Sequence, residues 1–283
     1  MADIHVIAAP FHAGAHNLRV GAGPTRLLDD GLLDQLREAG HNTEVKFIAP
    51  VEEFEGEIGR TFEVKRRVAE VVRAARAAGA FPLVLAGNCN VEVGVSAGLR
   101  APAAALIWFD AHPDFDTPDE HRSGYLDGMG VATLAGQCWH NLAATIPGFT
   151  PLELDRLLYC GIRDFEPGQL EKVERAGIAA VVGKLEGGVD YVEDFRERIE
   201  ALAYREAMIH LDVDCLDTSV GIANEYAAPG GLSEEDLLAC LRTTCRSARP
   251  LSLTIASFNP SLRGADRISA AARSAALLVA SFA

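Results

Sequence analysis

Long apolar runs and an excess of positive charge are both missing from this sequence. No uninterrupted apolar segment reaches about 18 residues, the length that a membrane-spanning helix needs. Residues 1–5 lack the basic start and the long apolar segment of a signal peptide. With 26 Lys and Arg against 40 Asp and Glu, the net charge is −14, which disfavours binding to nucleic acid or anionic membranes because both are polyanions. We therefore expect a cytoplasmic protein with no nucleic-acid or membrane partner.

Cysteine is also scarce, and its spacing shows no pairs. The 6 cysteines are scattered through a chain whose hydrophobic residues, 49% of the total, can bury a full core without disulfide bonds. We expect reduced and mostly buried thiols. The sequence contains no internal repeat, low-complexity linker or second domain, so residues 1–283 should form one domain.

Strand-like and helix-like segments alternate along the chain. A buried strand stopped by Pro10 is followed by a Gly-rich loop over residues 11–23 and by leucines at helical spacing over residues 24–40. This alternation predicts a three-layer α/β/α sandwich with a mainly parallel sheet. The predicted strands lie at residues 4–10, 43–48, 81–86, 104–109, 157–161, 179–182, 208–213 and 251–256, and further helices are predicted at residues 62–78 and from residue 91 to 99.

Two of the predicted strands end in clustered acidic residues. Asp110, His112 and Asp114 follow one apolar strand at alternate positions, and Asp212 and Asp214 follow another. Alternate residues share one side of an extended segment, and ligands bind outside the carboxyl ends of parallel strands. Carboxylates that cluster without a counter-charge repel one another and resist burial, so a purely structural role explains them poorly. The pattern predicts a site for one divalent metal ion or for a pair of them.

Seven motifs, in order along almost the whole chain, resemble those of the arginase, agmatinase and formiminoglutamase family, the ureohydrolases. The resemblance implies an arginase-like fold, two manganese ions that share a bridging water, a small-molecule substrate and a homo-oligomer. The matching segments are Asp110-Ala111-His112-Pro113-Asp114, Asp212-Val213-Asp214-Cys215-Leu216-Asp217, Ala8-Ala9-Pro10-Phe11 with Gly21-Ala22-Gly23-Pro24, Ser123-Gly124-Tyr125-Leu126-Asp127-Gly128, Gly161-Ile162-Arg163-Asp164, Gly230-Gly231-Leu232 and Asn259-Pro260-Ser261-Leu262.

By this resemblance, one of the two metal positions keeps all of its ligands. They would be His112, Asp110, Asp212 and Asp214, with Asp110 and Asp212 bridging to the other position.

The other metal position would be served by Asp114 and by the loop of residues 87–90. The family carries Gly-Gly-Asp-His there, and we align its metal-binding histidine with Asn90, a weaker ligand for transition metals. We therefore expect one tight and one loose manganese site, or a changed metal. Cys89 falls, in this alignment, at the family's supporting aspartate, which favours a supporting contact, although a thiolate ligand that prefers zinc stays open.

The substrate residues depart further from the family. Asp116 stands where arginase has an asparagine that holds the substrate's α-carboxylate, while Ser123 keeps a hydroxyl used for the same purpose. Glu166 stands near the acidic residue that meets the α-amino group. Ser257 replaces the glutamate that clamps the guanidinium, so a buried guanidinium would lose a bidentate, charge-assisted pair. These substitutions make ordinary arginase activity doubtful.

Proton transfer would also differ. Asp127 occupies the place of the histidine proposed as a proton shuttle in arginase, and His121 stands at a neighbouring carboxylate-binding position. We expect a hydrolase of a linear amidine, guanidino, ureido or amide compound, in which a metal-activated water attacks carbon and Asp127 or His121 moves a proton to the leaving nitrogen. Two alternatives stay open: a non-catalytic relative that keeps the fold and one structural metal, and a metal-dependent deacetylase, whose motif order matches less well.

Overall fold

A sheet of eight parallel strands forms the centre of the computed structural model, which describes residues 1–52 and 56–283. The strand order is β4-β1-β5-β10-β9-β6-β7-β8, so the mainly parallel sheet is confirmed. Every predicted strand is present. The strands are β1 (Asp3–Ala9), β4 (Asn42–Phe47), β5 (Phe81–Ala86), β6 (Ala105–Phe109), β7 (Leu157–Cys160), β8 (Ala179–Val181), β9 (Glu206–Asp212) and β10 (Arg249–Ala256).

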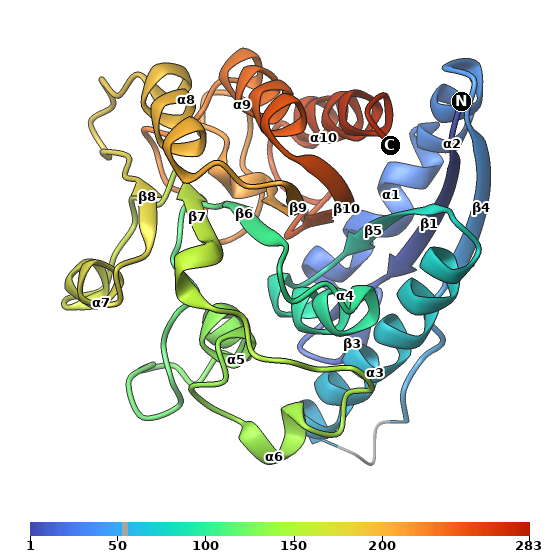
Figure 1. Cartoon of the computed structure of the whole chain (residues 1–283), viewed down its shortest axis with the longest axis horizontal. Helices are drawn as coiled ribbons and strands as arrows, with labels where there is room; N and C mark the ends of the chain where they lie inside the picture. Colours follow the sequence, from blue (N-terminus) through green and yellow to red (C-terminus); the bar gives the residue numbers. More distant parts are fainter. Residues whose placement is uncertain (53–55) are drawn as a thin grey trace.

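Helices cover both faces of the sheet and complete the three layers (Figure 1). Because each face is covered, the central strands are buried on both sides, which explains their continuous apolar sequences. Two hydrophobic clusters, one on each face, hold the layers together in the described part of the chain. One cluster includes α1 (Gly23–Asp29), α2 (Leu32–Glu38), α8 (Tyr191–Leu202), α9 (Glu234–Ser247) and α10 (Ala265–Ala280); the other includes α3 (Gly56–Ala77), α4 (Glu92–Leu99), α5 (Gly130–Leu134) and α7 (Gln169–Arg175).

Three local predictions need correction. The helix predicted at residues 24–40 is two helices, α1 and α2, because Gly31 between them has a left-handed backbone with φ of 90°. The helix predicted from residue 62 already begins at Gly56. Part of the predicted loop at residues 11–23 forms a small antiparallel hairpin, β2 (Phe11–His12) and β3 (Ala15–His16).

The strand order decides where the functional residues meet. Strands β5, β10, β9 and β6 are consecutive neighbours and run in the same direction. Their carboxyl ends therefore share one edge of the sheet, as ligand sites of open α/β sheets do. The loops after these four strands carry both acidic motifs, the loop of residues 87–90 and Ser257.

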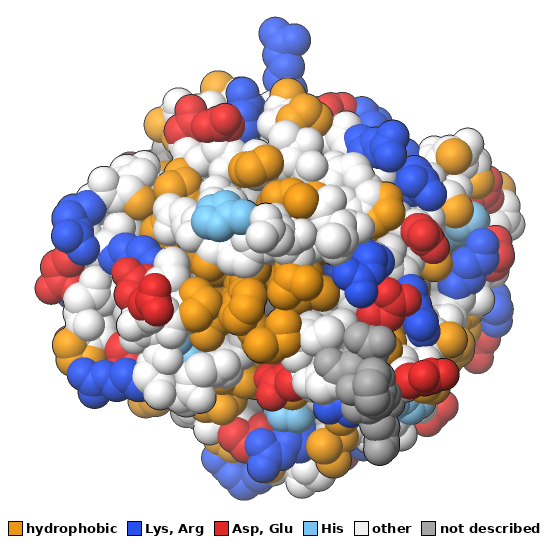
Figure 2. All heavy atoms as spheres, turned by 90° about the horizontal axis from the view of Figure 1, so that it is seen from below, with side chains coloured by type: hydrophobic (Ala, Val, Ile, Leu, Met, Phe, Trp, Pro, Cys, Tyr) orange, Lys and Arg blue, Asp and Glu red, His pale blue; other side chains and the backbone are white. Residues whose placement is uncertain are grey.

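One face of the molecule carries an apolar hollow. Figure 2 views the structure from below Figure 1, where hydrophobic side chains gather in the middle of the face. A hollow of about 490 Å³ lies between the start of α3 and the segment near Trp139. Its lining includes Pro118, Leu126 and other residues of the loop that also borders the larger pocket at the sheet edge. Within residues 1–52 and 56–283, no helix is both long and apolar enough to cross a lipid bilayer.

Candidate active site

The two acidic motifs meet at the carboxyl ends of β6 and β9. These strands are hydrogen-bonded neighbours in which Phe109 pairs with Leu211, so the residues that follow them are adjacent. Asp110, Asp212 and Asp214 are buried, with 1%, 4% and 1% of their surface exposed. The structure thus brings together residues separated by about a hundred positions in the sequence, as the two strand-end patterns predicted.

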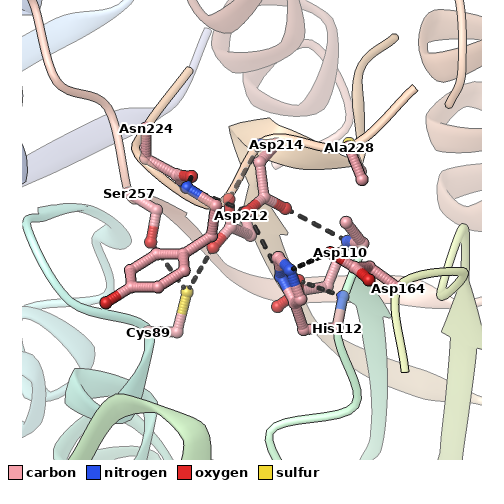
Figure 3. Close-up of polar contacts among 12 residues, drawn as sticks. Cys89, Asp110, His112, Asp164, Asp212, Asp214, Asn224, Ala228 and Ser257 are labelled. Atoms are coloured by element: carbon pink, nitrogen blue, oxygen red, sulfur yellow. Dashed lines mark hydrogen bonds and ion pairs between the residues drawn. The ribbon is translucent and has the colours of Figure 1, made fainter. Parts of the chain in front are cut away.

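The ligand atoms form two overlapping groups (Figure 3). In one group, His112 Nδ1 lies 3.3 Å from Asp110 Oδ1 and 3.3 Å from Asp214 Oδ2. In the other, ligand atoms of Cys89, Asp110 and Asp114 all lie within 4.8 Å of one another. Asp110 belongs to both groups. The arrangement therefore has the form of two adjacent cation positions that share one carboxylate.

The carboxylates of the cluster are buried close to one another, and this raises the pKa of three of them. Burial raises the pKa of Asp110 to about 6, and the charge of Asp214 adds to the effect. Burial and the neighbouring carboxylates also hold the pKa values of Asp114 and Asp212 well above the usual range. No Lys or Arg within the described residues forms an ion pair with these carboxylates. A bound cation would stabilise the ionised carboxylates, and their oxygens together with the imidazole and the thiol are a suitable ligand set for a divalent metal.

Asp214 differs from the other three carboxylates because it forms an ion pair with His112. Burial alone would lower the pKa of His112, but Asp214 and Asp110 outweigh it and raise the pKa well above its usual value. Burial alone would raise the pKa of Asp214, and His112 reverses the direction so that it is lowered. The pair thus favours positive charge between the imidazole and the carboxylates, and a metal ion bound there would supply that charge in place of a proton.

Cys89, rather than Asn90, faces the cluster. Its Sγ lies 2.9 Å from Asp212 Oδ2 and 3.2 Å from Ser257 Oγ (Figure 3). Both residues belong to the short 3₁₀ helix Cys89–Val91, in which successive side chains diverge by about 120°. The backbone N–H of Asn90 donates to Asp127, and its side-chain oxygen is buried without a hydrogen-bond partner among the described residues. The expectation for this loop is corrected: the thiol occupies the place where we expected the carboxamide.

The alignment that placed Asn90 at the family's metal-binding histidine is shifted by one residue from the contacts seen in the structure. Asn88 has the supporting contacts that we expected of Cys89: its Nδ2 donates to Asp127 Oδ2 at 2.6 Å and to Tyr125 Oη at 2.9 Å. The contacts of Asn88 and Cys89 therefore favour aligning Ala86-Gly87-Asn88-Cys89 with Gly-Gly-Asp-His. Allowing alanine for the first glycine at the end of β5 would have given this register from the sequence.

A pocket of about 600 Å³ opens above the cluster, and all four predicted substrate residues line it. At its mouth, Asp116 Oδ2 accepts hydrogen bonds from His121 Nδ1 at 2.9 Å and from Gln169 Nε2 at 2.7 Å. His121 Nε2 in turn lies 3.1 Å from Ser123 Oγ. Asp116 is therefore bound by two side chains, His121 and Gln169, at this end of the pocket.

Asp127, Ser257 and Glu166 occupy different depths of this pocket. Asp127 is buried beneath it, and burial raises its pKa although Asn90 and Asn88 donate hydrogen bonds to it. Ser257 is buried at the end of β10 with a left-handed backbone at φ of 64°, a strained conformation for a residue other than glycine. Glu166 is exposed, and its only contact among the described charges is a 3.7 Å ion pair with Arg122, which is weak at such a surface.

Several residues of the site were not predicted. Asn224 Nδ2 donates to Asp214 Oδ2 at 2.9 Å, and Asp164 Oδ2 lies 3.7 Å from His112 Nε2. The rings of Tyr125 and Tyr226 stack at 5.7 Å and line one wall of the pocket. Asp164 and Tyr125 lie within motifs that signalled the family, whereas Asn224 and Tyr226 lie in a segment without a pattern that sequence reasoning could use.

Comparison with known proteins gives consistent matches. A family model described as "Arginase family" matches residues 2–283. Arginase-1 of Oryctolagus cuniculus is 31% identical over 287 residues, covering 92% of this chain and 86% of that protein. The arginase of Eremothecium gossypii is 29% identical over 283 residues, covering 92% and 70%.

Solved structures show the same fold. The arginase from Bacillus caldovelox superposes with a TM-score of 0.86 at 21% identity, covering 99% of this chain and 98% of that one. A hypothetical agmatinase from Burkholderia thailandensis superposes with a TM-score of 0.74 at 18% identity, covering 99% and 85%.

Proposed function

This chain belongs to the arginase family, whose members hydrolyse carbon–nitrogen bonds other than peptide bonds, and we propose that it acts on a small linear amidine, guanidino, ureido or amide compound with a specificity altered from that of arginase. The observation that carries the proposal is the pair of ligand groups that share Asp110 beneath the pocket. When bound there, a divalent metal would lower the pKa of a water molecule toward neutrality and so supply a nucleophile.

We assign the metal ligands to two positions. His112, Asp110, Asp212 and Asp214 would hold one ion, for which manganese suits the oxygen-rich donor set. Cys89, Asp110 and Asp114, with Asp212 beside Cys89, would hold the other. A thiolate is a softer ligand than imidazole, so this second position favours zinc or cobalt over manganese.

Metal content tests the proposal directly. Protein produced with manganese and, in parallel, with zinc would be analysed for metal per chain, before and after treatment with a chelator. Two ions per chain support both positions, and one ion that is retained in the Cys89→Ala variant supports only the position at His112. A chain that binds no metal contradicts the hydrolase and leaves the non-catalytic alternative.

The Cys89→Ala variant should lose one of the bound ions. Cobalt-loaded protein should show sulfur-to-cobalt charge-transfer absorption in the near ultraviolet, and this absorption should be absent from the variant because Cys89 supplies the thiol of the proposed ligand set. Cys138→Ala is the matched control, since Cys138 is buried beside Thr133 outside the ligand groups. Unchanged metal content and absorption in Cys89→Ala would remove Cys89 from the ligand set.

The residues that replace the family's substrate contacts support a changed specificity. Ser257 offers a neutral hydroxyl, already 3.2 Å from Cys89 Sγ, in place of a carboxylate clamp for a guanidinium. The polar end of the pocket consists of Asp116, His121 and Ser123 joined by hydrogen bonds. Asp116 accepts from His121 Nδ1, and Ser123 Oγ lies within hydrogen-bond distance of Nε2, so both ring nitrogens have partners and the Ser123 oxygen is left to accept from a substrate that donates a hydrogen bond at this end.

Proton transfer is assigned first to Asp127. Its raised pKa, caused mainly by burial, suits a carboxyl group that delivers a proton, and Asn88 connects it to the loop that carries Cys89. His121 lies at the mouth, where Asp116 fixes its orientation, and is the second candidate.

The Asp127→Asn variant should lower kcat by about 10²-fold to 10⁴-fold, the usual contribution of a positioned acid or base, with metal content unchanged. The equivalent His121→Asn variant should act mainly on KM. Both would be measured with whichever compound of a guanidino, ureido, formimino and amide panel the unaltered protein hydrolyses. If His121→Asn instead gives the larger loss of kcat and removes one limb of the pH profile, His121 is the residue that transfers the proton and Asp127 is not.

A further inference from the structure

A buried pair of polar side chains, a glutamate and a histidine, lies beneath the cluster and has no part in the function proposed above. Glu92 begins α4 and His210 lies on β9, and both side chains are fully buried. His210 Nδ1 lies 3.2 Å from Glu92 Oε2. Charged residues are rarely buried unless they are paired, and a buried pair costs desolvation energy, so its presence in the core calls for a physical reason.

Trp108 connects this pair to the site. The indole ring stacks on the His210 ring with a centroid distance of 3.7 Å and an interplanar angle of 16°. The contact is set by the sheet, because Trp108 and His210 are partners in the register of β6 and β9. On the other side, Trp108 Nε1 donates a hydrogen bond of 2.8 Å to Asp110 Oδ2. One continuous chain of contacts therefore runs from Glu92 to the carboxylate that both ligand groups share.

The pair is poorly explained as a source of stability. Glu92 Oε1 and His210 Nε2 are buried without a hydrogen-bond partner among the described residues, and so is Oγ1 of Thr254, which pairs with His210 in the register of β9 and β10. An unsatisfied buried polar atom is destabilising, because it loses its hydrogen bond to water on folding and gains none in return. Apolar residues of similar volume at such positions are often neutral or stabilising.

We propose that Glu92 and His210 are positioning residues for the metal centre, a role that rests on the proposed function. Glu92 accepts from His210 and fixes the plane of its imidazole. The imidazole fixes the indole plane of Trp108 by stacking, and the indole N–H holds Asp110 Oδ2. Because Oδ1 of Asp110 accepts from the backbone N–H of His112 at 2.7 Å, the two contacts together set the rotation of the carboxylate that both cation positions use.

Three variants test the positioning role. Trp108→Phe keeps an aromatic ring but removes the hydrogen bond to Asp110. The double change Glu92→Leu with His210→Leu removes the pair without leaving one charge unpaired. Glu92→Gln keeps an oxygen that accepts from His210 Nδ1, and it is the conservative control. For each, affinity for Mn²⁺ would be measured by competition with a chromophoric chelator, and the unfolding midpoint would be measured on metal-free protein.

Trp108→Phe and the double variant should each weaken Mn²⁺ affinity by about 10-fold or more, as the loss of groups that orient metal ligands does, while Glu92→Gln stays near the unaltered protein. A triple variant combines Trp108→Phe with the double change. It should bind Mn²⁺ no more weakly than the weaker-binding of those two variants, because the pair acts through the indole. The metal-free unfolding midpoint of the double variant should not fall.

Other outcomes overturn the proposal. Unchanged affinity in Trp108→Phe and the double variant, or additive losses in the combined variant, would show that the pair does not act through Trp108. A lower metal-free midpoint with unchanged affinity would assign the pair to folding alone. Failure of the unaltered protein to bind Mn²⁺ would contradict the proposed function, and this result is distinct from the other two.

Discussion

Replacing Asp110 by asparagine should reduce hydrolysis by more than about 10³-fold and should remove the stabilisation of the fold by metal ions. Asp110 is the carboxylate common to both ligand groups, so its charge serves both cation positions at once. Activation of a water by metal contributes several kcal/mol, and each 1.36 kcal/mol is tenfold in rate. Asparagine keeps the shape but offers one neutral oxygen and an N–H₂ group that cannot accept from Trp108 or from the His112 backbone.

Two measurements check the Asp110→Asn prediction. Saturating Mn²⁺ should raise the unfolding temperature of the unaltered protein, since a ligand at about 100 times its Kd adds about 2.7 kcal/mol, and this shift should be absent from the variant. Asp119→Asn, an exposed change in the loop at the pocket mouth, should keep both the shift and the activity. An Asp110→Asn protein that retains both metal ions would show that the shared carboxylate is dispensable and that the ligand assignment is incorrect.

The strand ends of this site were predictable because their chemistry is local in sequence. The apolar strand before Asp110 and the alternation through His112 identify one strand end, and the same pattern before Asp212 identifies the other. The fold class followed from alternating strand and helix. That β6 and β9 are neighbours came from the resemblance, because no local pattern states which strands pair when about a hundred residues separate them.

The parts of the site that were not predicted depend on side-chain direction. Cys89 and Asn90 differ by one position in a 3₁₀ helix, where one residue changes the facing direction by about 120°. The partner of Asp116 was missed because His121 returns to it across the turn at the pocket mouth. In each case the family resemblance indicated the group of residues, and only the folded backbone decides which of them makes the contact.

Replacing Arg163 by methionine should destabilise the protein by about 3–5 kcal/mol, because several buried carbonyl groups lose their donor and each unsatisfied group costs about 1–3 kcal/mol. Arg163 is 3% exposed, and its guanidinium donates to main-chain carbonyl groups, with no carboxylate partner in the described part of the chain. Its Nη2 donates to the carbonyl oxygens of Asp214 at 2.9 Å and Ala228 at 2.8 Å, and Nη1 donates to that of Gly161 at 3.0 Å. The side chain thus ties the segment after β9 to two other segments and fixes the backbone at Asp214.

Methionine has a similar length but no donor, so these buried carbonyl groups would each lose a partner. Urea unfolding of metal-free protein measures the loss, and Arg198→Met, an exposed change on α8, should stay within about 0.5 kcal/mol of the unaltered protein. Arg163→Lys should fall between the two, because an ammonium group donates at most three hydrogen bonds and not in a planar fork. Because Asp214 is a proposed ligand, Arg163→Met should also weaken Mn²⁺ binding. Normal stability with weakened Mn²⁺ binding would show that Arg163 serves the metal centre and not the stability of the fold. Lower stability with normal Mn²⁺ binding would show that the segment after β9 keeps Asp214 in place without Arg163.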